Sequence, residues 1–206
     1  MGRPTFLDDM DELGYSLIRR KQGDFFMERT VIVNHTINLF NERGIRFSVD
    51  DLAKRIKMSK KTLYKEFGSK ENLITEVVKS LFSSIRSQEK TILANERRDI
   101  VERLKDILCL FPTQQINFAH MADIQLVYPQ VYKLILSELQ DNWENTLTVL
   151  EMAIQQERIH PIDPENLRIL LLGLFTELLT RDEAEQKKRT RECVDILFTG
   201  YEIPRH

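Results

Sequence analysis

Apolar residues recur at intervals of three and four positions along nearly the whole chain, and this periodicity constrains the fold more than any other feature. Ile135, Leu139, Trp143 and Leu147 are typical of the longest such stretch. Residues at this spacing share one face of an α-helix. Strand signals are nearly absent, because the chain has no Asn-Gly turn and no sustained alternation of β-branched and polar residues. The sequence therefore predicts an all-α protein.

Capping signals divide this pattern into separate helices. Asp24 is the expected N-cap of a helix that ends at Gly44, while Ser48 and Ser59 are expected to cap two short helices. Pro129 suits the first position of a long helix. The expected helices are 4–20, 24–43, 48–57, 60–67, 69–95, 99–111, 113–127, 129 to the break at 160–166, 164–180 and 183–201. We expect a domain over residues 1–70 and a larger one over 71–206, joined by the helix that begins at Ser69.

The two short helices lie in the one strongly basic part of a slightly acidic chain. Eight basic and three acidic residues lie between Ile45 and Lys70, although the whole chain has a formal net charge of −2. Two short helices joined by a tight turn, between supporting helices, are typical of a helix-turn-helix. In the second, Leu63 and Phe67 face inward. The residues left outside are suited to DNA phosphates and base edges: Lys60, Lys61, Thr62, Tyr64 and Lys65.

The stretch FSVDDLAKRIKMSKKTLYKEFGSKENLI, residues 47–74, resembles the DNA-binding region of the TetR/AcrR family of bacterial transcription regulators. INLFNERG, residues 37–44, resembles the end of the family's first helix, and ERIHPIDPENL, residues 157–167, resembles a connector before its eighth. The resemblance implies an N-terminal three-helix helix-turn-helix domain and a C-terminal helical ligand-binding and dimerisation domain. Helix 4–20 would be an addition to this plan.

In that family the third helix enters the major groove, so the resemblance implies base contacts from Lys60, Lys61 and Thr62. It implies phosphate contacts from Tyr64, Lys65 and Lys70. The starts of the two short helices add backbone N–H groups for phosphate oxygens. The expected DNA-binding residues are Ser48, Lys57, Ser59, Lys60, Lys61, Thr62, Tyr64, Lys65 and Lys70.

Three residues depart from the family pattern. Lys57 occupies a turn where glycine is usual, and a positive φ there costs about 1 kcal/mol, although its ammonium could reach a phosphate. Val49 stands where many members have a threonine, and Glu66 where histidine is common. No DNA contact is assigned to Val49 or Glu66. Arg3, within Gly2-Arg3-Pro4, could enter a minor groove from an N-terminal arm.

The last two helices are expected to form a dimer interface. Helix 166–179 is apolar nearly all round, with one stripe at 167, 170, 171, 174 and 178 and another at 169, 172, 175 and 179, so it should be buried on both faces. The resemblance implies that these two helices pair with their mates in a homodimer. The expected interface residues are Leu167, Leu170, Leu171, Gly173, Leu174, Leu178, Val194, Leu197, Phe198 and Tyr201. The alternative for helix 166–179 is a central core helix.

A sensory pocket follows from the resemblance alone. Aromatic residues and a few polar groups on the helices that would enclose it are the candidates, although aromatic residues at helical spacing often belong to ordinary core. The candidate ligand-binding residues are Phe111, Phe118, His120, Met121, Gln125, Tyr128, Tyr132 and Trp143. The effector is expected to be a partly apolar small molecule.

Other classes of function find little support in the sequence. There is no Ser-His-Asp order, Gly-rich phosphate loop or pair of carboxylates in an apolar context, so we expect no enzyme and no cofactor. His120 and Asp123 are too few ligands for a metal site. Cys109 and Cys193 are expected to be buried reduced thiols of a cytoplasmic protein. No run of apolar residues is long enough to span a membrane.

The sequence thus favours a ligand-responsive transcriptional regulator, a repressor, that binds a palindromic DNA operator as a homodimer and is released by a small molecule. The alternative is a TetR-like adaptor or co-regulator that acts through protein–protein contacts without specific DNA binding. Glu66 and the long N-terminal helix favour this alternative.

Overall fold

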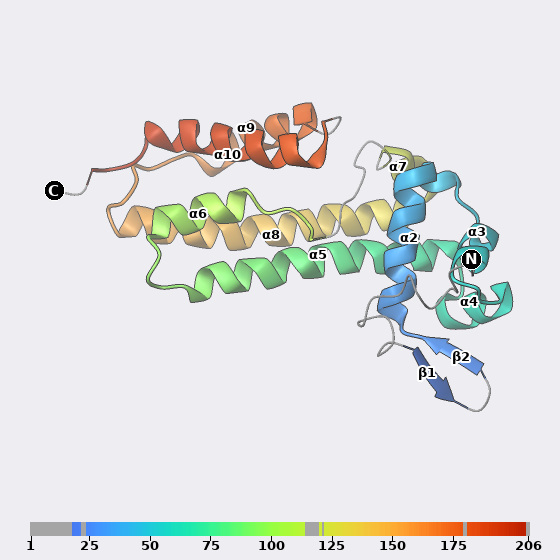
Figure 1. Ribbon diagram of the computed structural model, residues 1–206. Coiled ribbons are helices and arrows are strands. Elements are labelled where there is room, and N and C mark those ends of the chain that lie inside the picture. Colours follow the sequence, from blue (N-terminus) through green and yellow to red (C-terminus); the bar gives the residue numbers. More distant parts are fainter. Residues whose placement is uncertain (1–17, 22–23, 114–119, 121, 179–180, 205–206) are drawn as a thin grey trace, which may run out of the picture. The chain divides into compact units, whose positions relative to one another are not determined.

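The computed structural model describes residues 18–21, 24–113, 120, 122–178 and 181–204 (Figure 1). The chain divides into two compact units between Val77 and Val78. This boundary lies inside a single helix, seven residues beyond the expected domain limit at residue 70. The all-α class is confirmed, and a short hairpin of two strands precedes the helices.

The hairpin corrects two expectations for the N-terminal unit. Strand β1 (Ile18–Lys21) pairs antiparallel with β2 (Asp24–Met27), so Asp24 lies in a strand and is not an N-cap. Aromatic residues such as Phe25 and Phe26 favour extended backbone, which outweighs the capping preference of Asp24. The expected helix 4–20 ends in this strand, and its residues 4–17 lie outside the described residues, as does Gly2-Arg3-Pro4.

The remaining elements of this unit follow the expected helix-turn-helix plan. Helix α2 (Arg29–Arg43) begins five residues later than expected and ends at Gly44, whose φ of 57° suits glycine. A 3₁₀ turn, η1 (Gly44–Arg46), leads to α3 (Val49–Arg55), and α4 (Lys60–Phe67) follows. Helix α5 (Lys70–Ala94) starts here and continues into the second unit. The most buried residues of this unit include Ile32, Leu39, Phe47, Leu52 and Leu73.

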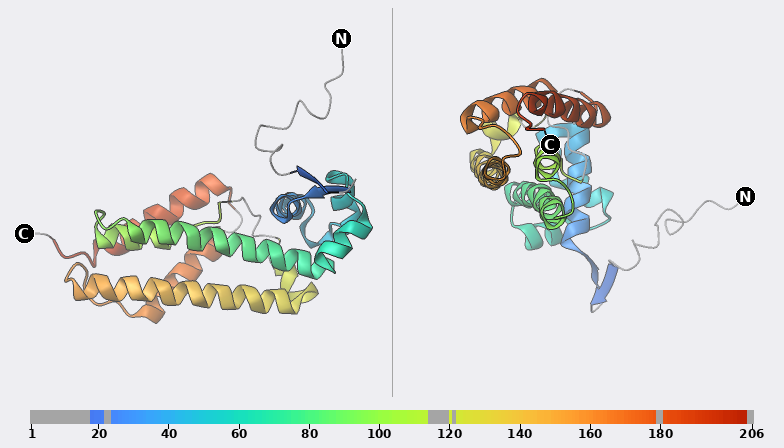
Figure 2. Two further views of the ribbon diagram at one scale, coloured as in Figure 1. Left: turned by 90° about the horizontal axis from the view of Figure 1, so that it is seen from below. Right: turned by 90° about the vertical axis from the view of Figure 1, so that its left-hand side faces the viewer.

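Within the residues that the structure describes, the C-terminal unit contains the rest of α5 and five further helices. They are α6 (Ile100–Leu108), α7 (Ala122–Val127), α8 (Pro129–Gln155), α9 (Pro164–Leu178) and α10 (Glu183–Thr199). Pro129 is the first residue of α8, as the sequence predicts, whereas α6 begins after Asp99 as its N-cap and ends three residues before the expected Phe111. In Figures 1 and 2, α6, α8 and the C-terminal part of α5 run alongside one another, and α9 and α10 lie together on one side of them.

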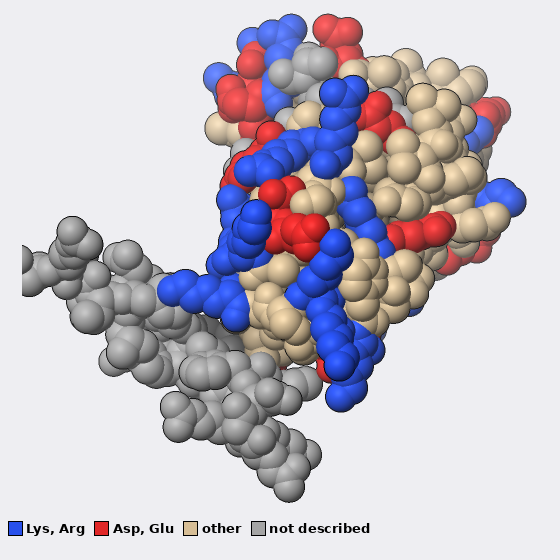
Figure 3. All heavy atoms as spheres, turned by 90° about the vertical axis from the view of Figure 1, so that its right-hand side faces the viewer, with Lys and Arg blue, Asp and Glu red and all other residues tan. Residues whose placement is uncertain are grey.

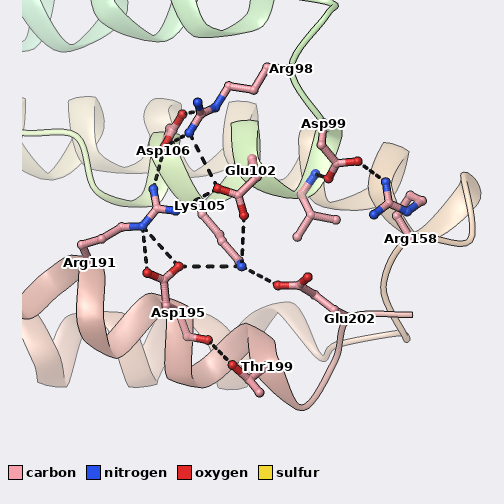
Figure 4. Close-up of polar contacts among 11 residues, drawn as sticks. Arg98, Asp99, Glu102, Lys105, Asp106, Arg158, Arg191, Asp195, Thr199 and Glu202 are labelled. Carbon is pink, nitrogen blue, oxygen red and sulfur yellow. Dashed lines mark hydrogen bonds and ion pairs between the residues drawn. The ribbon is translucent and has the colours of Figure 1, made fainter. Parts of the chain in front are cut away.

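An apolar core and a network of charges hold α10 to the rest of this unit. Val194 and Phe198 of α10 are fully buried in a cluster with residues of α6, α8 and α9. Beside it, the side chain of Lys105 on α6 is only 7% exposed and pairs with Glu102, Asp195 and Glu202 (Figure 4).

Arg191 strengthens this network. Its guanidinium contacts Asp106 at 2.7 Å, Glu102 at 2.9 Å and Asp195 at 3.0 Å (Figure 4). Cations and carboxylates alternate through the cluster, so each charge in it has an opposite neighbour. The face of α10 that carries Arg191 and Val194 is thereby directed into the unit.

The cysteines differ from expectation. Cys109 is half-buried, and burial raises the pKa of its thiol to about 11. Cys193 is exposed on α10, so the prediction of two buried thiols is wrong for this residue. The neighbouring residues in sequence do not determine whether the side chain at position 193 faces the core or the solvent. Within the described part of the chain, no helix has the length and apolarity that crossing a membrane requires.

Candidate nucleic-acid interface

Helix α3 begins with the predicted capping box. Ser48 Oγ accepts a hydrogen bond from the backbone N–H of Asp51 at 3.1 Å, and the Asp51 carboxylate accepts one from the backbone N–H of Ser48 at 2.8 Å. These hydrogen bonds, with help from Arg43, lower the pKa of Asp51 to about 2. The box fixes where α3 starts and so where the turn after it falls.

The turn between α3 and α4 is tight and contains a residue with positive φ. Lys57 has φ of 52°, and the next residue, Met58, donates its N–H to the carbonyl of Ala53 at 3.0 Å. This six-to-one hydrogen bond ends α3 in the manner that glycine usually allows. The sequence-based expectation that Lys57 adopts this backbone conformation is confirmed, and its side chain is exposed.

Helix α4 presents a basic face, as predicted. Ser59 Oγ accepts from the N–H of Thr62 at 3.0 Å and so caps the helix. Leu63 and Phe67 are buried, which directs the remaining side chains outward. Lys60, Lys61, Tyr64 and Lys65 are exposed and Thr62 is half-buried. In Figure 3, Lys and Arg side chains, shown in blue, gather over the visible face with acidic groups between them.

Two lysines of the predicted set are engaged within the domain. Lys60 Nζ donates to Asp50 at 2.9 Å at the exposed surface, and this hydrogen bond raises the pKa of the ammonium. Lys70 Nζ donates to the carbonyl of Ile45 and lies 4.3 Å from the centre of the Phe47 ring. Partial burial lowers the pKa of Lys70. The Lys70 ammonium therefore holds α5 to η1, which gives it a structural role in the free protein.

Glu66 and Val49 have structural explanations. Arg29 at the start of α2 donates to the backbone carbonyl of Glu66 at 2.9 Å, lies 3.9 Å from its carboxylate and stacks over the Phe67 ring at 4.6 Å. Glu66 thus belongs to an anchor between α2 and α4. Val49 is 8% exposed and packs in the core. Neither residue therefore supports the alternative that the protein is an adaptor acting through protein–protein contacts.

The expected dimer residues fall into two groups. Five of them form part of the protomer's own core and are at most 8% exposed: Leu167, Leu171, Leu178, Val194 and Phe198. They are not available to a partner, so the expectation that these five residues form the dimer interface is corrected. Leu174, Leu197 and Tyr201 are half-buried. Leu170 and Gly173 are exposed.

The outward face of α9 carries apolar residues from both stripes, because Leu170 is exposed together with Ile169 and Leu172, whereas Phe175 packs against the core. Ile169 is 55% exposed and Leu172 is 47% exposed, while Ile196 on α10 is 74% exposed. Gly173 follows Leu172, and a Cβ added to it would meet nothing within 4 Å. The sequence shows that α9 has two apolar faces, but choosing the inward one requires knowing which face α6 and α8 cover.

The expected ligand-binding residues differ in their surroundings and exposure. Phe111 packs edge to face on Phe175, with ring centres 6.1 Å apart. Trp143 is half-buried against the core cluster and Gln125 is exposed. His120, Tyr128 and Tyr132 are half-buried. Phe118 and Met121 lie outside the described residues.

Sequence reasoning overlooked Glu89 on α5. It is 5% exposed, although glutamate rarely occupies such a position. The signal was present in the sequence, since Glu89 interrupts an apolar stripe formed by Phe82, Ile85 and Ile92.

Comparison with known proteins supports the resemblance drawn from the motif. Residues 32–77 match the sequence model described as "Bacterial regulatory proteins, tetR family". The chain is 24% identical over 176 residues to the uncharacterized HTH-type transcriptional regulator YvaF of Bacillus subtilis, covering 82% of this chain and 93% of YvaF.

Solved structures share the fold. A TetR-family regulator from Cytophaga hutchinsonii superposes with a TM-score of 0.70 at 18% identity, covering 86% of this chain and 96% of its own. A regulator from Saccharomonospora viridis in complex with choline superposes with a TM-score of 0.71 at 16% identity. The match covers 86% of this chain and 98% of that regulator.

Proposed function

We propose that this chain, whose helix-turn-helix domain belongs to the TetR family of bacterial regulatory proteins, is a ligand-responsive repressor that binds a palindromic operator as a homodimer. The observation that carries the proposal is the outer face of α4, where Lys60, Lys61, Tyr64 and Lys65 are exposed on a capped helix next to a tight turn. Such a helix fits the major groove, and its lysines replace counterions along the phosphates.

Lys61 is the strongest candidate for a base contact. It is exposed at the start of α4, where the recognition helix of a helix-turn-helix reads base edges. Lys60 lies beside it, but its ammonium is shared with Asp50. We assign phosphate contacts to Lys57, Tyr64 and Lys65, whose side chains are exposed. The hydroxyls of Ser48 and Ser59 accept the capping hydrogen bonds, so only their backbone groups are assigned to DNA.

A two-fold homodimer is supported by the exposed stripe of α9. Ile169, Leu170 and Leu172 lie on one helix beside Gly173, and Ile196 extends the apolar surface onto α10. Apolar residues this exposed gain free energy when a second copy covers them. A two-fold axis would present two recognition helices to successive major grooves about 34 Å apart, which suits a palindromic operator.

The course of α5 supports release by a small molecule. This helix begins beside α4, and its C-terminal part belongs to the second unit. A ligand that favours one position of α5 would change the spacing of the two recognition helices and so lower operator affinity. The choline complex of the Saccharomonospora viridis regulator supports a small organic effector.

A gel-shift experiment tests the proposal. The protein is titrated against DNA from around its own gene and against random DNA of equal length, over a series of salt concentrations. We expect tighter binding to the cognate region and a salt slope of about 0.9 per phosphate contact. Equal affinity for both DNAs, with Lys60 and Lys61 intact, would contradict a sequence-specific repressor.

A further inference from the structure

Glu89 places a carboxylate in the apolar side of α5. Phe82, Ile85 and Ile92 lie three or four positions from it or from one another, so all four share one helix face. Phe82 is 8% exposed and Glu89 is 5% exposed, and the pKa of the Glu89 carboxyl is raised by this burial. An ionised carboxylate in such a position lowers stability unless charges and donors surround it.

The contacts of Glu89 only partly compensate for its burial. The side chain of Asn145 on α8 hydrogen-bonds to it, and Arg86, one turn earlier on α5, attracts its charge. Arg86 also pairs with Glu138 of α8. Among the described residues, however, Glu89 Oε1 is inaccessible to solvent and has no hydrogen-bond partner.

A second acceptor lies one turn away from Asn145. Asn142 Oδ1 is likewise inaccessible and has no hydrogen-bond partner within the described part of the chain. Glu138, Asn142 and Asn145 are four and three positions apart, so they share the side of α8 that meets Arg86 and Glu89. Figures 1 and 2 show α5 and α8 running alongside each other.

Glu89 Oε1 and Asn142 Oδ1 restrict the kind of ligand that could bind here. Both are acceptors, and one of them belongs to a carboxylate, so a binding partner must donate hydrogen bonds and would gain most from a positive charge. Unpaired buried acceptors cost stability, which proteins tolerate mainly at functional sites. The flanking Ile85 and Ile92, one turn to either side of Glu89 on α5, offer apolar contacts to an organic body.

We propose that Glu89 and Asn142 recognise the effector and that this effector is an organic ammonium ion with N–H donors and an apolar substituent. The inference rests on the proposed function, because it names the ligand class of the sensory unit. The Glu89 carboxylate pairs with the ammonium, and Asn142 Oδ1 accepts a second N–H.

The test measures ligand binding without DNA. Butyl-, hexyl- and benzylammonium chloride are titrated into the full-length protein by calorimetry, next to the alcohols of the same carbon skeletons. Glu89→Gln removes the charge and keeps the shape of the side chain. Glu144→Gln, an exposed change on α8, is the matched control. Circular dichroism and thermal melting establish that each variant is folded.

We expect at least one ammonium ion to bind the natural protein and Glu144→Gln with equal affinity, and its alcohol to bind neither measurably. Affinity for Glu89→Gln should fall by about tenfold or more. The proposal is overturned if no ammonium ion of this panel binds, or if binding is unchanged in folded Glu89→Gln. Operator binding is measured separately by gel shift, so failure of the repressor proposal and failure of cation recognition give different results.

Discussion

At the scale of single residues, Lys57 accepts a strained backbone where glycine would be unstrained. Its φ of 52° costs a residue with a Cβ about 1 kcal/mol relative to glycine. In function, the exposed ammonium can offset part of this cost by contacting a phosphate. Stability and DNA affinity should therefore respond differently to changes at this position.

The pair Lys57→Gly and Lys57→Ala separates these two effects. Both variants lose the ammonium, but only alanine keeps a Cβ at positive φ. We expect Lys57→Gly to be more stable than Lys57→Ala by about 1 kcal/mol, measured by urea unfolding. Both should lose the same amount of DNA affinity in gel shifts. Equal stabilities would contradict the strain at this turn.

Glu89 should make stability depend on pH. Its folded-state pKa is raised above its unfolded value by burial, so the folded protein binds the proton more tightly. The stability associated with this group is fully present below the unfolded pKa and is lost as pH rises through the higher folded pKa. Glu89→Gln does not titrate, and we expect it to melt at a higher temperature than the natural protein near pH 7.

The advantage of Glu89→Gln should shrink as the pH falls through the raised folded-state pKa, because the natural carboxyl then becomes protonated. Thermal melts of both proteins between pH 4.5 and pH 8 measure the difference. Glu144→Gln, an exposed carboxyl-to-amide change on α8, is the control variant for the substitution itself. A constant difference between Glu89→Gln and the natural protein across this range would show that the charged form of Glu89 is not disfavoured by folding.

At the scale of elements, the lysines of α4 and of the start of α5 have two separate roles, DNA contact and packing within the domain. Lys61 points outward from the helix, whereas Lys70 at the start of α5 donates to the carbonyl of Ile45 and lies over Phe47. From the sequence alone, Lys61 and Lys70 are indistinguishable members of one basic stretch. Only the packing of η1 against the start of α5 distinguishes them.

Lys61→Ala should weaken DNA binding without changing stability. Loss of one phosphate or base-edge charge is expected to reduce the salt slope by about 0.9 and to lower specific affinity by about 1–3 kcal/mol if Lys61 contacts a base. Fluorescence anisotropy with labelled operator DNA over a salt series measures both. Lys90→Ala, an exposed change in the part of α5 that belongs to the second unit, is the control and should leave the slope unchanged.

Lys70→Ala should mainly destabilise the helix-turn-helix domain. The variant loses a partly buried hydrogen bond and a cation–π contact, together about 1–2 kcal/mol. Thermal unfolding followed by circular dichroism should show the loss, while Lys61→Ala melts like the natural protein. If Lys70→Ala has unchanged stability and a reduced salt slope, Lys70 contacts phosphate as its place in the motif predicts.

At the scale of the whole molecule, sequence patterns predicted most helices and the motif but not which faces are covered. Ser48, Ser59 and Pro129 are local signals, so the starts of their helices could be located from neighbouring residues alone. The two apolar stripes of α9 are equivalent in sequence, and only tertiary packing buries Leu167 and Leu171. The buried charge of Glu89 is likewise set by α8, which lies about fifty residues away in the chain.

The choice between these stripes gives the last prediction. Leu172→Glu places a charge on the outward face of α9, where a second copy would have to bury it without a partner. We expect this variant to remain folded and to sediment as a monomer, whereas the natural protein sediments as a dimer. Leu136→Glu, at an exposed apolar residue of α8, is the control and should remain dimeric.

Leu171→Glu distinguishes the inward stripe from the outward one. Because Leu171 is 6% exposed within its own unit, a charge there should unfold the unit and not merely dissociate a dimer. Analytical ultracentrifugation and circular dichroism together separate these outcomes. A monomeric Leu172→Glu should also lose cooperative binding to a palindromic operator, since two linked recognition helices are needed to bind both half-sites at once. A dimeric, operator-binding Leu172→Glu would place the interface elsewhere on the molecule.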